Sequence, residues 1–257
     1  MTGDGDLPLF LAASPGVARI TVERVEGSAP RDAGTWMLVA PEAEFETIGG
    51  GALEHRAIAA ARAMLAEGGD GLDLTMPLGP EIGQCCGGRV TLSIRRLDEA
   101  ARAALHADHA ADIAARPAVH VFGVGHVGRA LARALSLLPV RAVLVDSRAD
   151  LLAAAPAAVE TVLTPLPEAV VRAASPGAAF IVMTHDHATD FLIAREALAR
   201  GDAAYVGLIG SRSKRAAFEG WLRREGDTVV AAPLVCPIGG HGTREKRPAA
   251  IASFVAA

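Results

Sequence analysis

Apolar and polar residues alternate in the first part of the chain in a way that predicts strands. The segment 17–26, "VARITVERVE", has this alternation. A turn rich in proline and glycine leads from it to a second strand in "SAPRDAGTWMLVA". Two further strand patterns, "LDLTMPLG" and "RVTLSIRRL", follow an amphipathic helix pattern in "GGGALEHRAIAAARAMLAEGG" that ends at Gly68–Gly69. Residues 1–100 therefore predict a small α/β domain.

A polar, alanine-rich stretch separates this domain from the rest of the chain. The pattern of "DEAARAALHADHAADIAARP" is helical, and Pro117 ends it. We therefore predict a helical connector over residues 101–117 and a second domain over 118–257.

In the second domain, apolar strand patterns alternate with helix patterns. The strands are expected in "AVHVFGV", "VRAVLVD", "VETVL", "AAFIVMT", "AYVGLIG" and "PLVCPIG". Such alternation is typical of a parallel sheet with helices on both faces. The predicted fold class is therefore α/β, with a C-terminal Rossmann-like sheet and a smaller N-terminal α/β domain.

The first strand of the second domain runs into the glycine motif "GVGHVG". In a Rossmann fold, Gly123 makes a tight turn, Gly125 lets the backbone approach a phosphate, and Gly128 lets helix and strand pack closely. The helix that begins near His126 presents free N–H groups to an anion. Asp146 ends the next strand, 23 residues after Gly123, where a carboxylate can accept from a ribose diol.

Further polar segments follow the later strands of this domain. These are "THDH" at 184–187, "GLIGSRSK" at 207–214 and "CPIG" at 236–239. Because the carboxyl ends of parallel strands share one edge of the sheet, we expect the polar residues there to line one crevice. The residues concerned are Gly125, His126, Asp146, Thr184, His185, Asp186, His187, Gly210, Ser211, Lys214, Cys236 and Gly239.

Several of these residues also have a purely structural interpretation. Two histidines around Asp186 can bind a metal, but residues two apart on a strand point in opposite directions, and an aspartate before a helix commonly caps it. Capping or a polar ligand contact is favoured. Lys214, one of only two lysines, can hold a phosphate or solvate a helix. Cys236 can equally be a small buried apolar residue.

Composition excludes several classes of protein. The net charge of −4 and the 4% aromatic content argue against a nucleic-acid binder that works by charge and stacking. The N-terminus has no signal-peptide pattern, and no apolar run is long enough to span a membrane. Three cysteines cannot form a disulfide framework, which favours a cytoplasmic location.

Two of those cysteines are adjacent in a glycine-rich loop, "GQCCGGRV". Three cysteines with no second pair do not supply a four-ligand zinc site, and a disulfide between neighbours is strained. Thiolate chemistry remains for Cys85 and Cys86, as ligands of a transition metal or as sulfur nucleophiles or carriers. A second glycine loop, Gly49, Gly50 and Gly51, opens a helix and can also receive an anion.

Taken together, these motifs resemble the XdhC/CoxI family, which are accessory proteins of xanthine dehydrogenase and related molybdenum hydroxylases. The similarity covers nearly the whole chain. It rests on "TIGGGALE", "GQCCGGRV", "FGVGHVGRALARAL", "VDSR", "MTHDHATD", "YVGLIGSRSKRAAF" and the C-terminal "CPIG" with "EKRPAAIA". The "GHGT" segment between the last two is atypical of the family.

The resemblance implies a function as a cofactor carrier rather than a turnover enzyme. Members bind the molybdenum cofactor (molybdopterin), hold it while a cysteine desulfurase supplies sulfur, and deliver it to the apo-dehydrogenase. They are typically homodimers. By this resemblance Cys85 and Cys86 act on the metal or its sulfur, and Gln84, Gly49, Gly50, Gly51 and the crevice residues contact the cofactor.

Two alternatives from other classes stay open. The glycine motif and Asp146 also suit an NAD(P)-dependent oxidoreductase, with His185 as acid or base. The paired thiols speak against it, because hydride transfer needs none. A scaffold that bridges dehydrogenase and desulfurase without binding any small molecule is the third possibility.

Overall fold

The computed structural model describes residues 7–79, 87–157, 159–239 and 245–257 of the chain. The chain divides into two compact units, residues 1–110 and 111–257. Each unit has its own hydrophobic core, and each is described by itself below.

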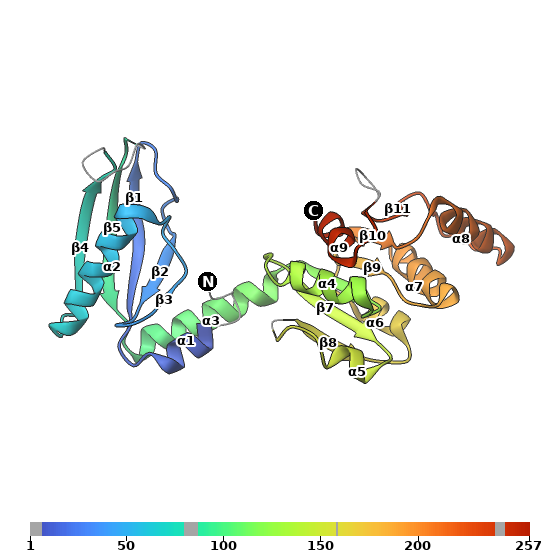
Figure 1. Ribbon diagram of the computed structural model, residues 1–257, viewed down its shortest axis with the longest axis horizontal. Coiled ribbons are helices and arrows are strands. Elements are labelled where there is room, and N and C mark those ends of the chain that lie inside the picture. The colour runs from blue at the N-terminus through green and yellow to red at the C-terminus, as the bar shows by residue number, and fades with distance from the viewer. Residues whose placement is uncertain (1–6, 80–86, 158, 240–244) are drawn as a thin grey trace. The chain divides into compact units, whose positions relative to one another are not determined.

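The first unit is built on a five-stranded antiparallel sheet in the order β3-β2-β1-β5-β4 (Figure 1). Inward-facing residues alternate along its central strands, as the sequence pattern predicts, so that every second side chain of β5 is buried. The strands are β1 (Ala18–Glu26), β2 (Trp36–Val39), β3 (Glu44–Phe45), β4 (Gly71–Pro77) and β5 (Arg89–Arg96).

Helices supply the apolar partners of this sheet. Helix α2 (Gly51–Ala66) buries Leu53 and Met64 in the same cluster as the central strands. Helix α1 (Leu7–Ala13), which the sequence pattern did not predict, packs Phe10 near Phe45 in a second cluster.

Helix α3 (Glu99–Ala115) begins in the first unit and ends in the second. Its first half is anchored within the first unit, because Leu105 is buried in the cluster of α1 and Arg102 donates hydrogen bonds to the carbonyls of Leu11, Ser14 and Pro15. This part of the predicted connector is therefore packed against its own unit.

The second unit contains a six-stranded parallel sheet in the order β11-β10-β9-β6-β7-β8. The strand order reverses between β6 and β9, which is the switch point at which open α/β sheets bind ligands. The strands are β6 (Ala118–Phe122), β7 (Arg141–Asp146), β8 (Glu160–Leu163), β9 (Ala179–Val182), β10 (Tyr205–Leu208) and β11 (Leu234–Val235).

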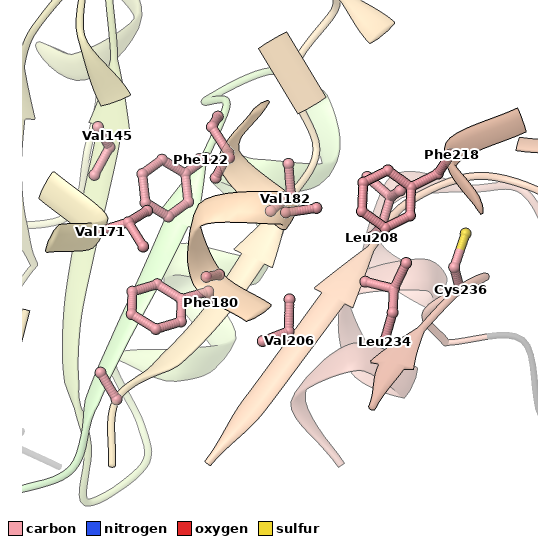
Figure 2. Packing of buried hydrophobic residues seen from close by; sticks show 14 of the residues in the cluster. Phe122, Val145, Val171, Phe180, Val182, Val206, Leu208, Phe218, Leu234 and Cys236 are labelled. Atoms are coloured by element: carbon pink, nitrogen blue, oxygen red, sulfur yellow. The ribbon is translucent and has the colours of Figure 1, made fainter. Parts of the chain in front are cut away.

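Helices cover both faces of this sheet, which confirms the predicted fold class. On one face, α6, α7 and α8 enclose a core that includes Phe122, Phe180 and Phe218 (Figure 2). On the other face, α4, α5 and α9 pack against the remaining side of the strands. The helices are α4 (His126–Leu135), α5 (Ala149–Leu152), α6 (Pro167–Ala173), α7 (His187–Ala199), α8 (Arg212–Arg224) and α9 (Pro248–Ala256).

Candidate functional site

The glycine motif forms a tight connection between β6 and α4. Gly123 has a positive φ of 99°, and a Cβ atom there would lie 2.5 Å from the carbonyl oxygen of Met183, the residue after β9. A Cβ on Gly128 would lie 2.2 Å from the carbonyl oxygen of Gly123. Both positions therefore exclude any side chain, and the geometry is that expected for the first and third glycines of the motif.

Gly125 differs from the other two glycines because its surroundings are open. Apart from its own chain neighbours, no described heavy atom lies within 4 Å of a Cβ built on this residue. Gly125 is the N-cap of α4, and the exposed His126 is the first residue of that helix. The first N–H groups of a helix have no partner within it, so this opening gives an anion access to them.

Asp146 lies at the end of β7 and is bonded on both carboxylate oxygens. Its Oδ2 accepts from the backbone N–H of Val124 at 2.7 Å and from a terminal guanidinium nitrogen of Arg148 at 2.9 Å. Its Oδ1 accepts from the backbone N–H of Arg148 at 3.0 Å and from Nε at 2.9 Å. The carboxylate thus ties the glycine turn to the end of the next strand.

These hydrogen bonds favour the charged forms of both Asp146 and Arg148. Burial alone would raise the pKa of Asp146, but the hydrogen bonds from Arg148 and Val124 together outweigh it and hold the pKa below its ordinary value. The hydrogen bond to Asp146 raises the pKa of Arg148. Both groups are charged at neutral pH.

A cavity of about 110 Å³ opens beside this pair, at the switch point of the sheet. Its lining includes four of the residues that the sequence predicts for the crevice, namely Asp146, Thr184, His185 and Asp186, together with Gly123 of the glycine motif. The complete lining consists of Phe122, Gly123, Val145, Asp146, Ser147, Arg148, Thr164, Pro165, Pro167, Thr184, His185, Asp186 and Thr189.

The "THDH" segment connects β9 to α7 and caps that helix. The carboxylate of Asp186 accepts from the backbone N–H and the hydroxyl of Thr189, both at 2.7 Å. These hydrogen bonds lower the pKa of Asp186. His185 and His187 are exposed. As the N-cap of α7, Asp186 has the capping role that the sequence favours. Among the described residues, no group of three or more His, Cys, Asp or Glu side chains is placed to hold a metal ion.

Lys214 has an internal partner that the sequence analysis missed. Its ammonium group forms an ion pair with Asp190, whose side chain is fully buried, and donates to the carbonyl of Ile209 at 3.0 Å. Asp190 also accepts from the backbone N–H and the hydroxyl of Thr184, at 2.9 and 2.7 Å. The pair joins the segment after β9 to the segment after β10.

The neighbouring predicted residues support this arrangement. A Cβ on Gly210 would lie 2.6 Å from Cδ of Lys214, so the glycine leaves room for the lysine chain. Ser211 is the N-cap of α8, with its hydroxyl accepting from the N–H of Lys214. These three residues lie outside the cavity lining described above.

Cys236 follows β11 at the same edge of the sheet. It is buried beside Phe218 and Leu234 (Figure 2), and its thiol donates to the carbonyl of Ser211 at 3.7 Å. Burial raises the pKa of this thiol, although Lys214 and Arg215 oppose the rise. Its surroundings therefore favour the neutral thiol and a packing role.

In the first unit, the glycine loop donates hydrogen bonds to a carboxylate of the same chain, that of Glu54. All three glycines, 49, 50 and 51, have positive φ. The carboxylate of Glu54 accepts from the backbone N–H of Ile48 at 2.9 Å, from that of Gly50 at 3.1 Å, and from the hydroxyl of Thr47. An internal side chain thus occupies donors that the sequence assigns to a ligand.

Gln84, Cys85 and Cys86 lie outside the described residues. The roles assigned to them stay predictions. No helix in the described part of the chain has the length and apolar character needed to cross a membrane.

Comparisons with known proteins agree with the fold. A sequence model of the XdhC Rossmann domain matches residues 119–257, and a model of the XdhC and CoxI family matches residues 10–75. No curated protein matches the chain. A crystal structure described as a xanthine dehydrogenase from Bacillus halodurans is similar, with a TM-score of 0.75 and 17% identity over 99% of this chain and 94% of that one. At this identity the likeness shows a shared fold.

Proposed function

Since the chain belongs to the XdhC and CoxI family, we propose that it is an accessory protein of xanthine dehydrogenase or a related molybdenum hydroxylase. Its cargo is the molybdenum cofactor, which it binds, holds during sulfuration and delivers to the apo-enzyme. The chain then acts as a carrier, and the cofactor does its chemistry in the client enzyme.

The cavity at the switch point is the observation that carries this proposal. Molybdopterin presents a phosphate, a flat pterin with hydrogen-bonding edges, and a metal held by a dithiolene. Outside the cavity lining, the open space at Gly125 and the first N–H groups of α4 also suit an anionic group. The polar side chains of Thr184, His185 and Asp186 suit the edge of a pterin.

The size of the cavity limits how much of the cargo it encloses. Pockets that hold a whole ligand of drug size have volumes of roughly 300–1,000 Å³. The volume of about 110 Å³ therefore accommodates one group of the cofactor, and the remainder extends along the strand ends. Those strand ends lead to Gly210, Ser211 and Lys214.

The adjacent thiols are assigned to the metal end of the cargo. Thiolates are soft ligands that bind transition metals and carry sulfur. We assign Cys85, Cys86 or both to the molybdenum or to the sulfur that it receives, with Gln84 beside them. In this proposal, the N-terminal domain (1–100) supplies the thiols, residues 101–117 connect, and the Rossmann domain (118–257) holds the phosphate and pterin.

The same proposal defines the partners. The sulfur comes from a cysteine desulfurase, the cofactor goes to the apo-dehydrogenase, and the carrier is a cytoplasmic homodimer. Neither a nucleic acid nor a membrane is involved.

Purification from cells that make the cofactor tests this function. Protein from such cells should contain molybdenum and phosphorus in near-equal amounts, and protein from cells unable to make molybdopterin should contain neither. The variants Cys85→Ala and Cys86→Ala, singly and together, test the thiol assignment. If the double variant retains as much molybdenum as the parent, the thiols do not hold the metal.

A titration with NADH separates this function from the oxidoreductase alternative. Saturable binding of NADH with turnover, in protein free of molybdenum, would favour the oxidoreductase. The bonding of Asp146 argues against NAD as the cofactor of such an enzyme, because all of the carboxylate's acceptor positions for a ribose diol already have donors.

A further inference from the structure

Arg148 is the one arginine or lysine among the described residues that line the cavity. Lys214, which the sequence suggests for a phosphate, instead contacts the buried Asp190. Any anion that enters the cavity therefore finds its cationic partner in Arg148, whose side chain is 39% exposed.

The way in which Arg148 contacts Asp146 leaves part of its guanidinium group available. The group has five N–H donors in a planar fork. One on Nε and one on a terminal nitrogen donate to the carboxylate of Asp146, both at 2.9 Å. Three donors remain: two on the edge formed by the two terminal nitrogens, and one on the second terminal nitrogen that points back toward Cδ. No described residue accepts from this second terminal nitrogen. That edge matches the oxygen spacing of a phosphate.

The acidic groups of the cavity already accept hydrogen bonds. Asp146 accepts from Val124 and Arg148 on both of its oxygens, and Oδ2 of Asp186 accepts from Thr189 at the start of α7. In a Rossmann fold the carboxylate at the end of this strand, here Asp146 on β7, binds the ribose diol, and Asp146 has no acceptor position left for one. A phosphate needs donors, and Arg148 supplies them.

We propose that Arg148, held in place by Asp146, binds a phosphomonoester in this cavity and selects such ligands over those with a free ribose diol. The proposal rests on the proposed function for the identity of the cargo, whose phosphate is one source of this chemistry. The ribose phosphate of a dinucleotide such as NADPH is the other source.

Binding measurements on cofactor-free protein test this inference. The probes are molybdopterin released anaerobically from a molybdenum enzyme, the same preparation treated with alkaline phosphatase, NADPH and NADH. The variant Arg148→Gln removes the positive charge. Arg148→Lys keeps the charge but lacks the guanidinium edge that is left free by Asp146. Arg133→Gln is the matched control, because Arg133 is exposed at the far end of α4 from the glycine turn.

We expect the parent and Arg133→Gln to bind phosphorylated molybdopterin at least tenfold more tightly than the dephosphorylated form. Arg148→Gln should lose this preference, and Arg148→Lys should retain only part of it. The inference is overturned if Arg148→Gln keeps the preference, or if the parent has none. If Arg148→Gln does not fold, the lysine variant decides in the same way.

The outcomes also separate this inference from the proposed function. Equal binding of both molybdopterin forms by the parent would leave the cargo in place and overturn the role of Arg148. A preference for NADPH over NADH that Arg148→Gln loses, with no binding of molybdopterin, would support the phosphate site and overturn the proposed cargo.

Discussion

The ammonium group of Lys214 and the carboxylate of Asp190 form an ion pair at the carboxyl edge of the parallel sheet, with the lysine side chain 10% exposed and the aspartate fully buried. The two residues are 24 positions apart, on α8 and α7. Their contact fixes the segments that follow β9 and β10, including Thr184, which lines the cavity. The candidate site therefore depends on a buried charge pair that lies beside it.

Removing one charge of this pair should be costly for stability. Lys214→Met leaves the carboxylate of Asp190 buried without its cation, which costs about 3–5 kcal/mol in the free energy of unfolding. Replacing both residues, Asp190→Leu with Lys214→Met, should cost clearly less than the sum of the two single changes. Denaturant unfolding measures both. Lys246→Met, at the exposed second lysine, is the control and should change little; additive costs would contradict the pairing.

Substitutions at two glycines of the motif should affect stability and cofactor binding differently. Gly128→Ala places a Cβ against the carbonyl oxygen of Gly123 and should destabilise the protein by about 1–3 kcal/mol or more. Gly125→Ala meets open space and an ordinary φ of −71°, so its cost should stay below about 1 kcal/mol. It should nevertheless weaken cofactor binding several-fold by narrowing the approach to the helix. Thermal unfolding and binding assays on both variants measure these effects. If the two variants lose the same stability, the prediction is wrong.

His120 should make the second unit sensitive to acid. Burial, with the positive charges of Arg141 and Arg200, lowers the pKa of His120 from 6.5 to about 4. As the pH falls from 8 to 5, the unfolded chain gains a proton that the folded protein does not accept. The free energy of unfolding should then decrease by about 2 kcal/mol.

The variant His120→Phe should abolish most of this acid dependence. The ring of His120 packs against both Phe122 and Phe180, at centroid distances of 6.4 and 5.5 Å, so phenylalanine suits the site. His126→Gln, at an exposed histidine, serves as the control. Denaturant unfolding at pH 8, 6.5 and 5 measures how the free energy of unfolding changes with pH in each variant. If it changes as much in His120→Phe as in the parent, other groups cause the acid dependence.

Glu54 should stabilise the glycine loop of the first unit. Glu54→Ala leaves the N–H groups of Ile48 and Gly50 without their acceptor, and we expect a loss of about 1–2 kcal/mol in the free energy of unfolding. Glu67→Ala, beyond the other end of the same helix, is the comparison. If both variants lose the same free energy, the carboxylate of Glu54 has no special role.

Local signals in the sequence predicted much of the fold. The alternation of apolar segments after Pro117 predicted the parallel sheet, and the spacing of Gly123, Gly128 and Asp146 placed the turn and the acid at the strand ends where they lie. These features depend on short-range sterics and on periodicity, which a single sequence contains. The short helix α1 was missed, since its seven residues hold little periodic pattern.

Side-chain partners were harder to predict. Nothing near Lys214 in the sequence indicates that Asp190 will be buried against it, because the pairing depends on how α7 and α8 pack. Similarly, Arg148 follows Asp146 by two residues, and this spacing does not by itself predict the bidentate hydrogen bond between the guanidinium group and the carboxylate. The loop of Gly49, Gly50 and Gly51 was predicted to bind an anionic ligand. The carboxylate of Glu54, a few residues further along the chain, accepts hydrogen bonds from this loop instead.

Transfer of cofactor to a client enzyme tests the central claim most directly. Protein purified from cofactor-producing cells is mixed with cofactor-free xanthine dehydrogenase, and hydroxylase activity is measured as the carrier is titrated. We predict that activity rises in proportion to the molybdenum carried, and that carrier lacking Cys85 and Cys86 transfers far less active cofactor. If the carrier contains no molybdenum and the dehydrogenase stays inactive at every ratio, this protein is not a cofactor carrier.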